Sequence, residues 1–180
     1  RMTGDSPAAV ALRKLIHNRS AQVGFVLCAG FTLMALLAPW LAPYSYKKLD
    51  LANRMVAPGQ LGHWLGTDNL GRDLLSRLIY GSRVSLAVGI FSVSISVLVG
   101  VPLGALAGYA GRWVDTLIMR LMDLLLAFPS ILLAIAIVTV LGNDLNNAMI
   151  AVGVVGIPVF ARITRASVLT VKELEYVQAA

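Results

Sequence analysis

The stretch VSLAVGIFSVSISVLVGVPLGALAGYAG, residues 84–111, decides the fold of this chain. It contains no charged side chain and is longer than the ~20 apolar residues that a helix needs to cross a bilayer. The whole 180-residue sequence has the same character, since 58% of it is hydrophobic and only 13% is charged. A soluble domain normally carries about 25% charged residues. Because only helices and closed barrels span membranes, we expect an all-α, polytopic helical membrane protein.

Small residues recur at every fourth position of this span. They are Ser92, Ser96, Gly100, Gly104 and Gly108. Side chains four positions apart share one face of a helix, and small residues on that face let two helix backbones approach closely within a membrane. The column therefore predicts a helix-packing face. The sequence leaves open whether the partner helix belongs to this chain or to another subunit.

Three further apolar segments predict spans, which makes four in this chain. They are the segments 21–43, 117–141 and 145–161. Basic residues cluster just before the first of them, and positive charge flanking a span favours the cytoplasmic side. The expected organisation is a cytoplasmic segment at 1–20, a first transmembrane helix at 21–43, an extracytoplasmic loop at 44–82 and a core domain at 83–180.

The loop at 44–82 ends in an amphipathic pattern. Apolar residues recur at helical spacing from Leu70 to Ile79, and polar residues occupy the other face. Thr67 or Asp68 is placed to cap the start of such a helix. The pattern predicts a short helix that lies in the membrane interface.

Charged residues stand at the start of the third predicted span, before its uncharged run at 124–143. Arg120 and Asp123 are three positions apart, so they are expected to pair on one helix face near the inner membrane surface. Pro129 follows, where it interrupts the hydrogen-bond ladder of the helix and suits a hinge. Two interpretations stay open, an anchoring ion pair or a part in gating.

The last stretch, RITRASVLTVKELEYVQAA at 162–180, continues the fourth span as a helix that turns polar. Starting from a cytoplasmic N-terminus, four crossings return this tail to the cytoplasm. Arg162 and Arg165 are expected to hold its root at the anionic inner leaflet.

Several kinds of chemistry are missing from the sequence. No lysine follows a glycine, so a phosphate-binding loop cannot form, and any nucleotide is expected on another chain. His17 and His63 stand apart without metal-ligand spacing, so we expect solvated or interfacial roles and no metal site. Cys28 is the single cysteine, and the basic residues form no nucleic-acid surface. We expect no catalytic residue in this chain.

Three motifs carry a resemblance to a known family. HWLGTDNLGRDLLSRLIYGSRVSL, GYAGRWVDTLIMRLMDLLLAFPSILLAIAIVTVLG and IPVFARITRASVLTVKELEYVQAA resemble the C-type inner-membrane permease subunit of the dipeptide, oligopeptide and nickel ABC importers. The similarity runs over residues 21–180. It implies a type I ABC importer transmembrane fold with six spans, of which this sequence holds four, so we expect the sequence to be a fragment.

The resemblance also implies partners and sites. The partners are a homologous B-type permease, two ATPase subunits that hold ATP and Mg²⁺, an extracytoplasmic substrate-binding protein and membrane lipid. Coupling to the ATPases falls on the start of the family's EAA signature, at Glu173, Leu174, Glu175, Tyr176, Val177, Gln178, Ala179 and Ala180. Gln178 stands where the signature has glutamate, which removes a charge and keeps a hydrogen-bonding side chain. Candidate contacts to the binding protein, or pairing partners within the loop, are Asp68, Arg72, Asp73 and Arg77.

The expected function is therefore that of a bacterial inner-membrane permease subunit, which forms half of the pathway for peptides or related small solutes. A nucleotide-independent channel or secondary transporter is the alternative, and it would need polar groups near the middle of the membrane. A membrane scaffold that uses the small-residue face only for assembly is a third possibility.

Overall fold

A computed structural model describes residues 18–173 of the chain. Every regular element in that range is a helix, which confirms the expected all-α class. The elements are α2 (Arg19–Leu36), α3 (Ala38–Leu41), the short 3-10 helix η1 (Leu51–Asn53), α4 (Leu74–Ala110), α5 (Arg112–Ala127), α6 (Ser130–Leu141) and α7 (Leu145–Lys172).

Three of these helices are long and apolar enough to cross a membrane: α2 with 18 residues, α4 with 37 and α7 with 28. The pair α5 and α6 would make a fourth span if they are taken together, but they meet at an angle of 92°. The described part of the chain thus holds three or four candidate spans. The third span that the hydropathy indicates at 117–141 is divided into two helices, and the break falls at Phe128 and Pro129, where the sequence predicts an interrupted helix.

The contacts divide the chain into two compact units, one up to Leu86 and the other from Ala87 onward. In the first unit the predicted span at 21–43 is broken near its end. Helix α2 stops at Leu36 and the single turn α3 follows, with Pro39 in its first positions. Proline is tolerated in the first turn of a helix, because the N–H group that it lacks would have no partner within the helix there.

The short interfacial helix predicted in the loop is wrong. Residues 67–73 are irregular, and the helix that starts at Leu74 continues without a break through Ala110. Neither Thr67 nor Asp68 caps it. The carboxylate of Asp73 accepts a hydrogen bond of 2.7 Å from the backbone N–H of Ser76, which satisfies one of the free donors of the first turn.

A glycine explains why the helix cannot begin earlier. Gly71 has a φ of +73°, and a Cβ at this position would overlap the backbone carbonyl of Asp50. Only glycine adopts this conformation without strain, so the chain turns here before α4 begins. The part of the amphipathic pattern from Leu74 to Ile79 is therefore the start of a long helix rather than a separate element.

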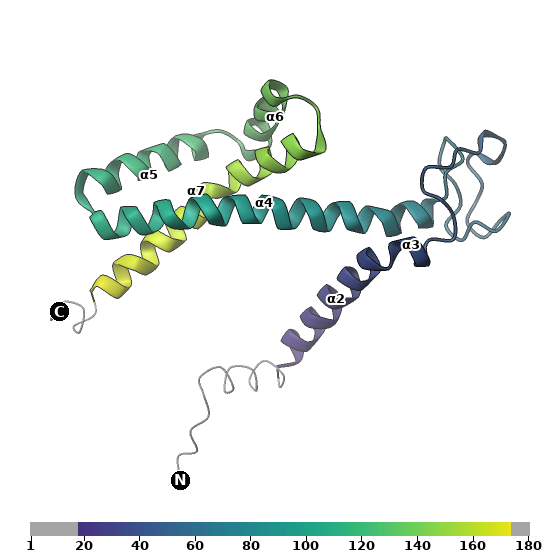
Figure 1. The fold of residues 1–180 in the computed structure, drawn as a ribbon, viewed down its shortest axis with the longest axis horizontal. Helices are drawn as coiled ribbons and strands as arrows, with labels where there is room; N and C mark the ends of the chain where they lie inside the picture. The colour runs from purple at the N-terminus through teal and green to yellow at the C-terminus, as the bar shows by residue number, and fades with distance from the viewer. Residues whose placement is uncertain (1–17, 174–180) are drawn as a thin grey trace, which may run out of the picture. The chain divides into compact units, whose positions relative to one another are not determined.

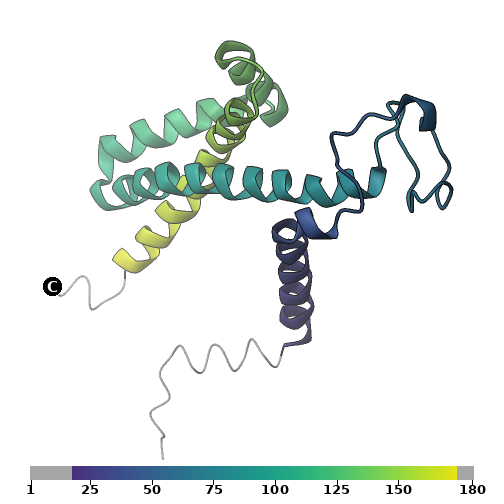
Figure 2. The same ribbon diagram turned by 45° about the vertical axis from the view of Figure 1, so that its right-hand side comes forward.

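In the second unit α7 runs obliquely across α4, and both views show the crossing (Figures 1 and 2). Helix α7 also packs against α5 and α6. Met122 of α5 with Ile157 and Ala161 of α7 forms the buried core. The prediction that the fourth span continues into the polar tail is confirmed as far as Lys172, because α7 is one helix despite Pro158 inside it.

Candidate functional site

The small-residue column of α4 lies against α7 of the same chain. A Cβ at Gly100 would lie 2.7 Å from the carbonyl oxygen of Ile157, and a Cβ at Gly104 would overlap the carbonyl of Ala161. At Gly108 it would lie 2.9 Å from the side chain of Val168. The two backbones are thus in direct contact over two turns of helix, and no larger residue fits at these positions.

The two serines of the column extend the same contact. Buried Ser92 donates a hydrogen bond of 2.9 Å to the carbonyl oxygen of Met149, and buried Ser96 donates one of 2.7 Å to that of Gly153. In return, a Cβ at Gly153 would lie 2.8 Å from the Cβ of Ile95. The partner helix that the sequence left open is therefore α7, which offers small residues of its own.

Two ion pairs join α5 to α7 beside this crossing. Arg165 donates two hydrogen bonds of 2.5 Å to the two carboxylate oxygens of Asp115. The side chains of this pair are 33% and 20% exposed. A bidentate arginine–carboxylate contact fixes orientation as well as distance, so α5 and α7 are held in one register at this end.

The second ion pair corrects a prediction. Asp123 accepts a hydrogen bond of 2.5 Å from Arg162 on α7, and it does not pair with Arg120. Arg120 is exposed and forms no ion pair within residues 18–173. The ion pair therefore joins two helices rather than two neighbours on one helix face. The sequence placed Arg162 and Arg165 at the lipid surface, and the structure places both against carboxylates of α5.

The break after α5 lies next to this pair. Helix α5 ends at Ala127, Phe128 and Pro129 are extended, and α6 starts at Ser130 at 92° to α5. Pro129 supplies no backbone N–H, and it disfavours helical backbone at the residue before it. These two residues account for the break, and both helices beside it pack on α7.

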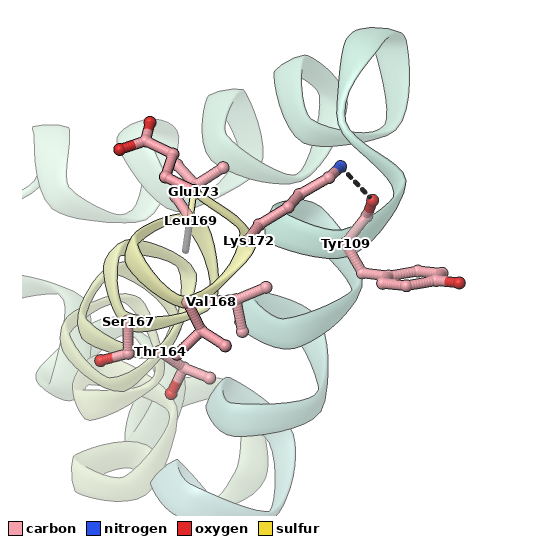
Figure 3. A pocket seen from close by; sticks show the side chains of 8 residues that line it. Tyr109, Thr164, Ser167, Val168, Leu169, Lys172 and Glu173 are labelled. Carbon is pink, nitrogen blue, oxygen red and sulfur yellow. Dashed lines mark hydrogen bonds between the residues drawn. The ribbon is translucent and has the colours of Figure 1, made fainter. Parts of the chain in front are cut away.

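The far end of α7 forms an open cavity of about 750 Å³ beside the end of α4 (Figure 3). Lys172 reaches across it and donates a hydrogen bond of 3.1 Å to the carbonyl oxygen of Tyr109. Of the predicted coupling residues, only Glu173 lies in the described range, where it forms the C-cap of α7. The other seven, at 174–180, lie outside the described residues.

In the loop of the first unit, Asp68 is a hub for hydrogen bonds. It accepts from the backbone N–H groups of Leu70 and Arg72 and from the side chains of Arg72 and Arg77. Desolvation raises the pKa of this carboxyl, but the hydrogen bonds from Arg72 and Leu70 outweigh it and lower the pKa to about 2. Three of the four candidate contacts to a binding protein are thus used within the loop.

The fourth candidate, Asp73, forms a hydrogen bond with His63, a contact that the sequence analysis missed. His63 lies 2.9 Å from the carboxylate of Asp73, and its ring packs on Tyr44 with 4.7 Å between the ring centroids. The His63 side chain is only 12% exposed, which contradicts the solvated one of its two expected roles. Burial raises the pKa of Asp73, but hydrogen bonds from Ser76 and His63 outweigh it and hold the pKa below its usual value. No pattern in the sequence indicates that two residues ten positions apart in an irregular loop are in contact.

These groups form contacts between helices of the second unit and within the loop of the first. Within the described range no three histidine, cysteine or carboxylate side chains gather where they could hold a metal ion. Cys28 is exposed on α2 and far in sequence from either ion pair. What the arrangement can do is mechanical, because it ties α4, α5 and α7 into one body through close backbone contact and two charged pairs.

Comparison with known proteins gives two family matches. Residues 100–180 match the binding-protein-dependent transport system inner membrane component. Residues 6–58 match the N-terminal TM domain of oligopeptide transport permease C. The motifs at 108–142 and 157–180 lie within the first of these matches, and the motif at 63–86 lies between the two.

Individual relatives are similar over almost the whole chain. A dipeptide transport system permease protein of Alkalihalophilus pseudofirmus is 46% identical over 178 residues, which are 99% of this chain and 58% of the relative. A di/tripeptide transport system permease protein of Pseudomonas aeruginosa is 45% identical over 97% of this chain and 59% of its own length. A glutathione transport system permease protein of Pectobacterium atrosepticum is 45% identical over 93% and 56%. The chain thus spans less than two thirds of the length of these relatives.

Proposed function

The chain belongs to the family of inner membrane components of binding-protein-dependent transport systems, and from this premise we propose that it is a permease subunit of an ABC importer. In this proposal it forms half of the translocation pathway for peptides or related small solutes. It carries no catalytic residue, and the energy comes from ATP and Mg²⁺ bound to separate ATPase subunits. The relatives in the comparison are named for dipeptide, di/tripeptide and glutathione transport.

One observation carries the mechanical part of the proposal, the rigid continuity of α7. Its 28 residues run from Leu145 to Lys172 as one helix, locked to α4 by backbone contact at Gly104 and to α5 by Asp115. A displacement applied at the Glu173 end must therefore move the crossing as a whole, since packed helices slide or rotate as units rather than bending freely.

The remaining parts of the proposal rest on the family to which the chain belongs. The tail beyond Glu173 docks on a cytoplasmic ATPase, a B-type permease supplies the other half of the pathway, and the loop of the first unit faces an extracytoplasmic substrate-binding protein. The chain lies in the bacterial inner membrane with its N-terminus in the cytoplasm. The 92° break at Pro129 is the place where α5 and α6 change their angle during transport.

The central test is uptake by the complex purified from native membranes and reconstituted into vesicles. We expect peptide uptake that requires ATP and an ATPase that co-purifies with this chain. Uptake that persists without ATP but collapses with an ion gradient would instead establish the nucleotide-independent transporter.

A variant tests the coupling tail directly. Replacing Tyr176 by Glu and both Ala179 and Ala180 by Arg should abolish ATPase co-purification and uptake while the protein still inserts into the membrane. Bulky charges prevent the close approach that small residues allow. The matched control Ala52→Arg, in exposed η1, makes the same chemical change in the other unit and should keep the ATPase bound. Retention of ATPase by the tail variant would refute the coupling role.

A labelling experiment tests sidedness. Cys28 is the single cysteine of the sequence, so Cys28→Ser gives a background in which Lys172→Cys is the only thiol. A membrane-impermeant thiol reagent should leave position 172 unmodified in intact cells and modify it in inverted vesicles. Rapid modification in intact cells would place α7's end outside and rule out an ATP-driven partner there.

A further inference from the structure

A second cavity lies in the first unit, at the point where α4 enters the apolar run. It has a volume of about 420 Å³, a size typical of small-molecule sites. Its walls are formed by Tyr46, Arg77, Tyr80, Gly81, Arg83 and Val84. No acidic side chain is among them, so the cavity combines two guanidinium groups with aromatic and aliphatic surface.

The aromatic wall is preformed. The rings of Tyr46 and Tyr80 pack at 4.3 Å between centroids, and the ammonium group of Lys47 lies 5.5 Å from the centre of the Tyr46 ring. This cation–π contact helps to fix the Tyr46 ring in place. Tyrosine is also enriched at the level of lipid headgroups, where its ring is apolar and its hydroxyl is solvated.

The charge of the cavity is not neutralised. Arg77 pairs with Asp68, but Asp68 is shared with Arg72, so this cluster keeps a net positive charge. Arg83 is exposed and forms no ion pair within the described residues. It is also the last charged residue before the uncharged stretch 84–111, which puts it at the boundary between water and hydrocarbon.

We propose that this cavity binds the phosphate headgroup of an anionic phospholipid. Arg83 and Arg77 face the phosphate, which guanidinium groups bind bidentately, and Val84 and the tyrosine rings contact the glycerol and the first acyl carbons. Most of the cavity wall is apolar carbon, and the charged groups of the cavity lie at one end of the apolar helix segment. An amphiphilic ligand therefore fits better than free phosphate.

Gly81 gives a way to close the cavity without disturbing the fold. It lies inside α4, and no atom comes within 4 Å of a Cβ built at this position. A side chain added here would therefore project into open space, and replacing glycine within a helix favours the helix. Gly81→Leu should fill the cavity while α4 stays intact.

The test uses the complex purified in detergent and titrated with dioctanoyl phosphatidylglycerol, with bound lipid counted by native mass spectrometry. Dioctanoyl phosphatidylcholine and inorganic phosphate are titrated in parallel. We expect saturable binding of the anionic lipid, at least fivefold weaker binding of the zwitterionic lipid, and no displacement by phosphate at equal concentration. Arg83→Gln should weaken binding by roughly fivefold, the effect of one basic group at an anionic surface, and Gly81→Leu should remove the saturable phase.

The control Arg54→Gln removes one exposed positive charge of the same loop outside the cavity. It should leave the affinity unchanged. Four results would overturn the proposal: an equal loss in the Arg54 and Arg83 variants, undiminished binding in Gly81→Leu, equal affinity for the two lipids, or displacement of the lipid by phosphate or by a peptide with a free carboxylate.

Discussion

Arg165 on α7 donates to both carboxylate oxygens of Asp115 on α5, at 2.5 Å each, across 50 positions of sequence. A second pair, Asp123 with Arg162, joins the same two helices but is far more exposed, at 59% and 52%. Both pairs join an arginine to an aspartate, and they differ in geometry and burial. Comparing them therefore shows how much an ion pair contributes to the stability of this protein in each setting.

The first prediction is that the half-buried pair, Asp115 with Arg165, contributes more than the exposed pair, Asp123 with Arg162. A double-mutant cycle with Asp115→Asn and Arg165→Gln should give a coupling free energy of about 1–2 kcal/mol, whereas the cycle with Asp123→Asn and Arg162→Gln should give less than about 0.5 kcal/mol. Solvent screening is the reason for the difference. The measurement is unfolding by SDS in mixed micelles, and equal coupling in the two cycles would contradict the prediction.

The second prediction concerns the backbone contact between α4 and α7. Gly104→Leu should lower the free energy of unfolding by about 3 kcal/mol, the upper end for overpacking, because a Cβ at this position overlaps the backbone carbonyl of Ala161. The matched control is Gly89→Leu in the same helix, where no atom lies within 4 Å of the added Cβ. A loss of the same size in both variants would show that the helix, and not the contact, was disturbed.

The third prediction separates hydrogen bonding from packing at the same crossing. Ser96→Ala removes the 2.7 Å hydrogen bond to the carbonyl oxygen of Gly153 but leaves the backbones in contact. We expect a loss of only about 0.6 kcal/mol, the average for hydrogen bonds between membrane helices. Ser94→Ala, at an exposed position of α4, serves as control and should change nothing measurable. A loss above that of Gly104→Leu would reverse the ranking.

The fourth prediction is acid lability of the loop around Asp68. The pKa of this carboxyl is about 2 in the folded chain and 3.8 in the absence of its partners. Its stabilising effect is therefore complete above pH 3.8 and is lost as the pH falls toward 2, because the unfolded chain then binds the proton more readily. Asp73, whose pKa is also lowered, acts in the same direction.

The fluorescence of Trp64 in the loop reports this transition once Trp40 and Trp113, the other two tryptophans, are replaced by phenylalanine. Asp68→Asn should unfold at a lower denaturant concentration at neutral pH and should show a weaker dependence on acid pH. An identical pH dependence in the parent and in Asp68→Asn would exclude Asp68 as the cause.

The loop shows most clearly what could not be predicted from sequence. The amphipathic pattern near Leu70 was correctly identified as helical from Leu74 onward, because period and composition are local properties. Its separate start was wrong, since the chain turns at Gly71, where it packs against the backbone of Asp50 from another part of the loop. His63 was missed for the same reason, as its partner Asp73 is brought near it only by the folded loop.

The sequence by itself determined that the chain is helical and spans membranes, because uncharged runs of this length have no other stable conformation in lipid. It also determined which face of α4 is small enough for close helix contact. Only the tertiary structure decided that α7 covers this face and that Asp115 and Asp123 pair with Arg165 and Arg162 rather than with neighbours on their own helix. The physical reason is distance along the chain: helix period and hydropathy are set within a few turns, whereas a partner 40 or 50 positions away is selected by packing of the whole bundle.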